Sequence, residues 1–359
     1  MEHFTLCEKK IGNCAGDFFC WIRTPGVCNV DDDNRVIAAA IIASDLMVYL
    51  TPVTFGGYAS TLKRMVDHQM QNVSAFFARV AGETHHAKRY KKNPDFLVVG
   101  WLDEPNAHSE IVFRHLVQRN ALNWHSKTYV SGVVLANQSD EEMQASAQKW
   151  LDDLQNRRSS QRVELPINEE TINGSVEMRR ALLLVGSPKT RKSTSNSLGG
   201  YLFEQLSARS IQTETIYLHT VLRSPQKMQA LFDAVDAADL VTLAFPLYVD
   251  SLPAPVIEAL ERMASKGKPL FVATGASDIG EMQDDAVIAV ELTDGTAEIL
   301  IGTRDGMAIR FPESDVRPMG RSAYGVRGIS TGNIAATATS ASPFNVASAP
   351  LPCKLTCNS

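Results

Sequence analysis

The sequence predicts an α/β protein built on a doubly wound parallel sheet that occurs twice along the chain and is incomplete in each copy. Short apolar runs alternate with segments of helical periodicity, which is the pattern of such sheets. Several of these runs are apolar on both faces, as expected for strands buried between two layers of helices. A stretch in the first half also repeats in the second. A short β-meander is predicted after the second copy.

The composition is that of an ordinary globular protein. The chain has 359 residues, of which 44% are apolar and 21% charged, with a net charge of −5. This charge gives no reason to expect nucleic acid or an anionic membrane as a partner. No apolar run approaches the ~20 residues that span a bilayer, and the start does not resemble a signal peptide. We therefore expect a cytoplasmic protein without a membrane partner.

The first predicted unit covers residues 1–156 and lacks an opening strand and a phosphate-binding loop. A stripe of apolar residues at helical spacing from Leu62 to Phe77 predicts a single helix there. The other expected elements are a helix and, after Asp45, a short strand halted by Pro52, both within residues 36–52, followed by a strand over 96–101, a helix over 111–122, a strand over 129–135 and a helix over 140–156.

A polar linker over 157–179 separates this unit from a second unit over 180–275, which has no clear last strand and helix. Its expected elements are strands at 181–185, 211–218, 240–245 and 270–273, alternating with helices at 198–206, 228–235 and 256–263. Residues 43–52 align with residues 237–246, and both stretches end in a proline. This agreement indicates a duplicated unit.

The alternation of predicted strands and helices ends at about residue 284. Short apolar runs at 287–292, 298–302 and 307–311 are separated by Asp-Gly turn signals, which predicts a β-meander over 284–329. Residues 330–359 are rich in Ser, Ala, Thr, Pro and Asn without an apolar period, so we expect them to be disordered.

Residues 186–196, here called the phosphate loop, lie between a predicted buried strand and a helix. Their sequence, Gly-Ser-Pro-Lys-Thr-Arg-Lys-Ser-Thr-Ser-Asn, combines hydroxyl donors with cationic side chains at a helix start. The free N–H groups and the positive dipole end of a helix start bind anions. The loop matches neither GxxxxGK[ST] nor GxGxxG. An ordinary Ser/Thr-capped helix with solvated lysines is the alternative interpretation.

Residues 246–252, here called the ring loop, follow the third strand of the second unit and read Pro-Leu-Tyr-Val-Asp-Ser-Leu. In open α/β sheets, ligands bind beyond the carboxyl ends of the strands. A flat apolar ring could rest on Leu247 and Tyr248 there, while backbone amides reach its polar edge. In the first unit the matching stretch, residues 52–58, contains two glycines that allow close backbone approach.

With Gly-Ser-Pro-Lys, Ser-Thr-Ser and Phe-Pro-Leu-Tyr-Val, the second unit resembles the flavodoxin-like family of NAD(P)H-dependent FMN reductases. The Thr-Pro-Gly-Val-Cys and Thr-Pro-Val-Thr-Phe-Gly-Gly stretches of the first unit resemble the iron–sulfur-flavoprotein branch. The resemblance covers roughly residues 11–270. It implies FMN and NAD(P)H as cofactors, with the flavin rather than a protein residue supplying the chemistry.

By the same resemblance, the FMN phosphate would contact Ser187, Lys189, Ser193, Thr194 and Ser195. The isoalloxazine ring would rest on Pro246, Leu247, Tyr248 and Val249. Electrons would pass to a small acceptor such as a quinone or a flavin. Members of this family often dimerise, so a homodimer is compatible with the resemblance.

Four cysteines fall within the first 28 residues. The iron–sulfur branch has a cysteine where this chain has Asp17, and a cubane cluster needs four thiolates. We therefore expect no iron–sulfur cluster. Packing or a redox-active thiol pair are the two interpretations of Cys14, Cys20 and Cys28. The adjacent His85 and His86 lie in a polar stretch, where a solvated loop is expected and a metal site is not.

Residues 288–329, with Glu-Ile-Leu-Ile-Gly-Thr-Arg-Asp-Gly-Met-Ala-Ile-Arg-Phe at 298–311, resemble about one blade of the C-terminal β-pinwheel of the DNA gyrase A subunit. DNA wrapping in that family depends on a positive perimeter. Here five arginines are outnumbered by eight acidic residues between Asp284 and Asp315, so DNA binding is not expected.

The function predicted from these features is that of an FMN-dependent NAD(P)H oxidoreductase. Two alternatives remain at this stage: a gyrase-type DNA-binding fragment, and a chimeric chain without catalytic activity, in which incomplete flavodoxin-like units are joined to foreign sequence.

Overall fold

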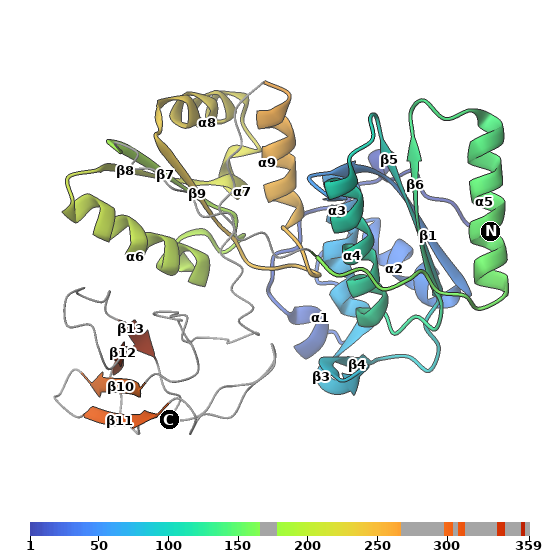
Figure 1. Ribbon diagram of the computed structural model, residues 1–359, viewed down its shortest axis with the longest axis horizontal. Helices are drawn as coiled ribbons and strands as arrows, with labels where there is room; N and C mark the ends of the chain where they lie inside the picture. The colour runs from blue at the N-terminus through green and yellow to red at the C-terminus, as the bar shows by residue number, and fades with distance from the viewer. Residues whose placement is uncertain (166–177, 267–297, 304–307, 313–335, 342–352, 356–359) are drawn as a thin grey trace.

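The structure is a computed structural model that describes residues 1–165, 178–266, 298–303, 308–312, 336–341 and 353–355. Two α/β units can be followed in Figure 1, each with its own sheet and helices. The α/β prediction is therefore confirmed. The expected strand at 270–273, the expected run at 287–292 and much of the linker lie outside the described residues.

The sheet of the first unit has the order β2-β1-β5-β6. Strands β1, β5 and β6 are parallel, whereas β2 is antiparallel to the end of β1, so the sheet is mixed. The elements of this sheet and of the helices around it are β1 (Leu46–Thr54), β2 (Gly57–Tyr58), β5 (Asp95–Leu102), β6 (Tyr129–Leu135), α1 (Phe19–Ile22), α2 (Asn34–Ala43), α3 (Ser60–Asp67), α4 (Ala107–Asn123) and α5 (Asp140–Gln155).

Alternation along the strands divides the first unit into two apolar layers. Tyr49 and Phe96 point into the main core, which also contains Phe113 of α4. On the opposite face, Leu97 and Val130 pack against α5. Helix α5 begins where the sequence signals it, because Ser139 and Glu142 form a complete capping box.

The apolar stripe expected to form one helix from Leu62 to Phe77 is divided in the structure, so that prediction is wrong in part. Helix α3 ends at Asp67, a 3₁₀ turn covers His68–Asn72, and β3 (Val73–Val80) pairs with β4 (Glu83–Lys88) in a hairpin. Val73 and Phe77 are compatible with a helical period, but valine and phenylalanine also favour strands.

The expectation of a solvated loop at His85 and His86 is also wrong. Both residues lie in β4, and His85 is buried between Asn123, whose Oδ1 is 2.8 Å from Nδ1, and Glu83, whose Oε2 is 3.1 Å from Nε2. The ring of His86 stacks on Phe77, with centroids 4.8 Å apart. The polar residues that flank His85 and His86 in the sequence therefore gave no indication that both residues pack in a hairpin.

The sheet of the second unit has the order β8-β7-β9, and all of its described strands are parallel. Its elements are β7 (Arg180–Val185), α6 (Thr194–Ala208), β8 (Gln212–Tyr217), α7 (Leu218–Val221), α8 (Pro225–Ala237), β9 (Leu240–Ala244) and α9 (Ala254–Ala264). Leu182 and Leu184 face α8 and α9, whereas Leu183 and Val185 face Phe203 of α6, so helices cover both faces of β7 (Figure 1).

The C-terminal part contains β10 (Glu298–Thr303) and β11 (Ala308–Pro312), which pair as an antiparallel hairpin, in agreement with the predicted meander. The expectation of disorder over 330–359 does not hold at two places. Residues Ala336–Ala341 form β12 on the other side of β10, and Cys353–Leu355 form β13 beside β12. Alanine and threonine without an apolar period gave no signal of these strands.

The two units contact one another through α3 and α9. Lys63 and Asp67, one turn apart on α3, form an ion pair that is almost completely buried, with exposed side-chain fractions of 0% and 1%. Lys63 Nζ also donates to the carbonyl of Tyr248 at 2.7 Å, and Asp67 accepts from the backbone N–H of Ala254 at 2.8 Å. Burial raises the pKa of Asp67, and the Lys63 cation opposes that shift.

More exposed polar contacts surround this buried pair. Ser60 caps the contact by binding the carboxylate of Glu261 through its N–H at 3.0 Å and its hydroxyl at 2.5 Å. Arg64 pairs with Glu258 at 2.6 Å, with about a quarter of the arginine side chain exposed (28%). The units are therefore joined by polar contacts around a buried ion pair.

We expect Lys63→Met to lower the free energy of unfolding by about 3–5 kcal/mol, because it leaves the buried Asp67 carboxylate without its cation. Arg64→Met is the matched control, since it removes a partly exposed pair worth only about 0–1 kcal/mol. Urea unfolding followed by circular dichroism measures both. Equal losses for the two variants would contradict a special role of the buried pair.

Candidate functional site

The candidate site lies at the carboxyl edge of the second sheet. Strands β7 and β9 are parallel neighbours, with Val185 opposite Ala244, so the phosphate loop and the ring loop begin side by side. The N–H of Gly186 donates to the carbonyl of Ala244 at 2.8 Å, which fixes this adjacency. The two loops predicted from sequence are therefore brought together at the edge where such sheets bind ligands.

Glycine is required at position 186. A Cβ atom there would lie 2.3 Å from Val256 Cγ2 and 3.0 Å from Phe245 Cβ, so any larger residue would displace α9 or the end of β9. Because glycine has no side chain, the backbone of residue 186 can pack against Val256 and Phe245 where the chain leaves β7.

The phosphate loop ends in a well-capped helix. Ser193 is the N-cap of α6: its Oγ accepts from the N–H of Asn196 at 3.1 Å and donates to the carbonyl of Thr190 at 2.7 Å. Its hydroxyl is thus already used within the loop. Ser187 and Ser195 are buried, with exposed fractions of 4% and 9%.

The remaining predicted phosphate contacts, Lys189 and Thr194, are exposed to solvent. The first-turn N–H groups of a 15-residue helix have no intrahelical acceptors, so α6 presents donors and a positive dipole end to this loop. Hydroxyls, cations and N–H groups form the donor set that a phosphate monoester needs. The residues present therefore fit the phosphate end of FMN.

The ring loop is a tight turn in an unfavourable conformation. Tyr248 and Ser251 exchange backbone hydrogen bonds of 2.9 and 3.1 Å, and the two residues between them, Val249 and Asp250, have φ values of +46° and +60°. Positive φ is a marked exception for a β-branched residue such as valine. Strain of this kind persists only where the surroundings impose it.

The surroundings that impose this turn belong to the first unit. Lys63 holds the carbonyl of Tyr248, and Asn120 Nδ2 lies 3.3 Å from the carbonyl of Val249 and 3.2 Å from Asp250 Oδ2. Asn123 also donates to the Asp250 carboxylate. The exposed Leu247, with a fraction of 55%, precedes the turn and offers an apolar surface next to it.

The start of the chain also reaches the site, which the sequence did not indicate. Gly16 has a φ of +61° and packs so closely on Tyr248 that a Cβ atom would lie 2.3 Å from the tyrosine Oη. The ring of Phe18 lies under Lys189, with Nζ 5.8 Å from its centroid. Only the folded arrangement places residues 16–18 between the two loops.

Tyr248 keeps its proton at any physiological pH. Burial is the largest cause that raises the pKa of its hydroxyl, and the nearby carboxylates of Asp67 and Asp17 raise it further.

Asp17 Oδ1 accepts the N–H of Phe19 at 3.0 Å. Across the described residues, no group of three or more His, Cys, Asp and Glu side chains is arranged to hold a metal ion.

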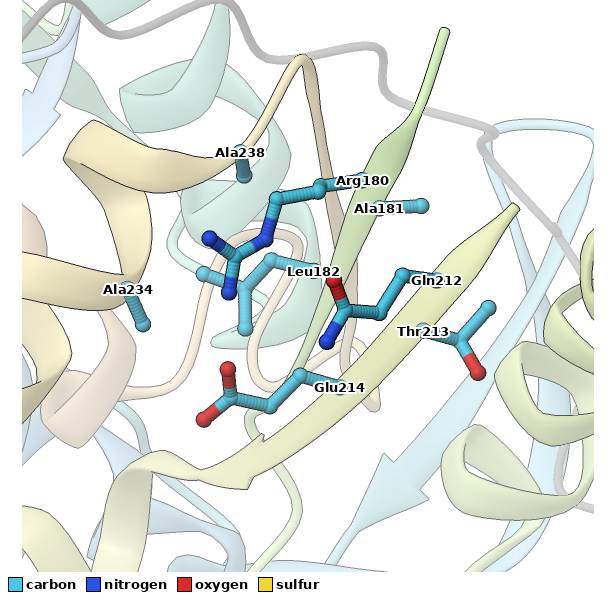
Figure 2. Close-up of a pocket in the computed structure, with 8 residues that line it drawn as sticks. All are labelled: Arg180, Ala181, Leu182, Gln212, Thr213, Glu214, Ala234 and Ala238. Carbon is cyan, nitrogen blue, oxygen red and sulfur yellow. The ribbon is translucent and has the colours of Figure 1, made fainter.

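A small cavity lies away from the candidate site. It has a volume of about 20 Å³, enough for roughly one water molecule, and is lined among others by Arg180, Gln212 and Glu214 (Figure 2). These residues belong to the starts of β7 and β8, at the amino edge of the sheet. The cavity therefore lies at the edge of the sheet opposite to both loops.

None of the helices that the structure describes combines the length and the apolar character needed to cross a bilayer.

Comparison with known proteins assigns different similarities to the two parts of the C-terminal half. Residues 179–290 match the family model of NADPH-dependent FMN reductase, and residues 297–335 match that of the DNA gyrase C-terminal domain, a β-propeller. The first match begins just before β7 and includes both loops of the site. It supports flavin oxidoreductase chemistry for the second unit and a flavodoxin-like fold.

Two curated relatives are similar to the C-terminal part of the chain. The gyrase A subunit of Haloquadratum walsbyi is 58% identical over 57 residues, which are 16% of this chain and 7% of that protein. The gyrase A subunit of Halalkalibacterium halodurans is 54% identical over 56 residues, again 16% and 7% of the two chains. The chain thus spans about 7% of the length of these relatives. No solved structure matches it.

We expect Ser187→Tyr to abolish flavin binding, because the phenol would fill the phosphate position at the end of β7. Ser207→Tyr, on an exposed position at the far end of α6, is the matched control and should leave binding unchanged. Flavin released from the purified variants by heat and measured by fluorescence tests this. Wild-type flavin content in Ser187→Tyr would remove the phosphate loop from the site.

We expect Cys20→Ala to leave the flavin content unchanged and to remove no brown chromophore, since Asp17 leaves too few thiolates for a cubane cluster. Iron and flavin analysis of wild type and variant, purified without air, provides the measurement. A loss of iron and of visible absorbance on substitution would show that a cluster forms after all.

Proposed function

We propose that this protein is an FMN-dependent oxidoreductase that takes electrons from NAD(P)H and passes them to a small acceptor such as a quinone or a flavin. The observation that carries this proposal is that a helix start with free N–H donors and a firmly held turn preceded by the exposed Leu247 meet at one edge of a parallel sheet. The family match over residues 179–290 supports it. FMN, when bound, accepts a hydride and releases its electrons singly or as a pair.

In this proposal the protein residues bind and orient the flavin. The phosphate is bound by the hydroxyls of Ser187 and Ser195 and by the first-turn N–H groups of α6. Lys189 and Thr194 contact it from the solvent-exposed side. Pro246, Leu247 and Tyr248 support the ring, whereas Val249 packs against the core of the first unit and holds the turn in place. Ser193 acts indirectly, because its hydroxyl caps the helix that carries the donors.

We further propose that the two units are copies of one ancestral unit. In support, the chain makes the same turn at the end of β1 and after β9, in each case two residues after a proline (Pro52 and Pro246). The turn at residues 54–57 has positive φ at Phe55 and Gly56, and the turn at residues 248–251 has positive φ at Val249 and Asp250. The helices that follow, α3 and α9, pack against each other. A covalently joined pair would then take the place of a homodimer.

A second candidate concerns the C-terminal part alone, where the gyrase similarity is strong but short. We propose that this segment does not wrap DNA, because acidic residues outnumber its arginines and a single blade has unpaired flanks. Retention on a DNA column that falls steeply with salt would favour the DNA-binding alternative. The change from FMN-reductase similarity, which ends at residue 290, to gyrase similarity, which begins at residue 297, is consistent with a chimeric reading frame.

The test of the proposed function is the visible absorption spectrum of the purified protein, before and after addition of FMN and then NADPH. We expect the two flavin bands to be present and to bleach with NADPH under anaerobic conditions. Readmission of oxygen or addition of a quinone should restore them. A protein that neither retains FMN nor oxidises NADPH would contradict the proposal.

A further inference from the structure

A thiol and an imidazole outside the flavin site face one another near the start of the chain. Cys28 Sγ lies 3.4 Å from His68 Nδ1, within hydrogen-bonding distance for sulfur. The other ring nitrogen, Nε2, lies 2.8 Å from the carbonyl of Gly12. A carbonyl only accepts hydrogen bonds, so Nε2 carries the hydrogen, and Nδ1 is free to accept the proton of the thiol.

Both partners are held in place by other contacts. The N–H of Cys28 donates to Gln71 Oε1 at 2.8 Å, and the carbonyl of Cys28 accepts from Arg35 Nε at 3.0 Å. His68 is buried, with 3% exposure, whereas Cys28 is only partly buried. The sulfur is consequently fixed beside its base in a residue that is partly exposed to solvent.

The charges around the pair favour the thiolate–imidazolium form. Burial raises the pKa of Cys28, but the hydrogen bonds from His68 and from the backbone of Val30 outweigh it, so the net pKa is lowered. Burial lowers the pKa of His68, yet the bonds to Cys28 and Gly12 raise it overall. The carboxylate of Asp32 raises both values, and Arg35 faces the pair from α2.

The pKa values of the two neighbouring cysteines, Cys14 and Cys20, are shifted in the opposite direction to that of Cys28. Burial raises the pKa of Cys14 to about 12 and that of Cys20 to about 11, and the neighbouring Cys28 charge adds to both shifts. Thiolates rather than thiols are the nucleophiles. Among these three cysteines, only Cys28 is therefore prepared for reaction near neutral pH.

We propose that Cys28 and His68 form a nucleophilic pair that reacts with small disulfides by thiol–disulfide exchange. His68 Nδ1 takes the proton from Cys28, and the thiolate attacks one sulfur of the disulfide. The bond between the two sulfurs of the small molecule breaks as the bond to Cys28 forms, and the departing thiolate takes the proton from His68. Cys28 is oxidised and the departing sulfur is reduced. This inference is independent of flavin binding.

The experiment is the reaction of the full-length protein with dithiodipyridine, followed through the absorbance of the released thiopyridone. At about pH 6.5 we expect one thiol to react in a fast phase that is lost in Cys28→Ser. His68→Asn should slow this phase at least about tenfold, because the thiolate fraction falls with the loss of the base. Cys20→Ser and Cys7→Ser are the matched controls and should keep the fast phase.

The pH profile of the wild type gives a second readout that needs no variant. The rate of an ordinary thiol rises with pH up to a pKa near 8.5, so we expect the Cys28 phase to level off clearly below about pH 8.5. A rate that keeps rising to that pH, a fast phase that survives in Cys28→Ser, or an unchanged rate in a folded His68→Asn variant would each overturn the proposal.

Discussion

Lys63 and Asp67 form a buried ion pair at the contact between the two α/β units. Each side chain also forms a hydrogen bond with a backbone group of the second unit. A buried pair of this kind tolerates few relative positions, because sliding either helix would leave an unpaired charge away from water. The partner carbonyl of Lys63 belongs to Tyr248 in the ring loop. The same interaction that joins the units therefore shapes the proposed flavin site.

The sequence predicted the features that depend on local chemistry. Buried strands such as Phe96–Trp101 and Ala181–Val185, the capped start of α6 and the proximity of the two loops all follow from apolar runs, capping residues and the rules of parallel sheets. Where two local preferences compete, as at Val73 to Phe77, the tertiary hairpin decided the outcome.

Other features depend on contacts between residues far apart in the chain and could not be read from sequence. The burial of His85 requires Asn123 and Glu83, and the approach of Gly16 to Tyr248 requires the docked units. The pairing of Cys28 with His68 likewise spans 40 residues. Sequence patterns identified these cysteines as unusual but did not rank their reactivity, because burial and the nearby imidazole set it.

The left-handed turn at Val249 and Asp250 has a consequence for how the molecule responds to ligands. Its conformation is imposed by Lys63 and Asn120 of the first unit, so any small molecule that binds this form of the turn also favours the docked arrangement. By thermodynamic reciprocity, docking must then raise affinity for that molecule by the same factor. Ligand binding at the ring loop and the docking of the two units are therefore linked equilibria, and a change in one shifts the other.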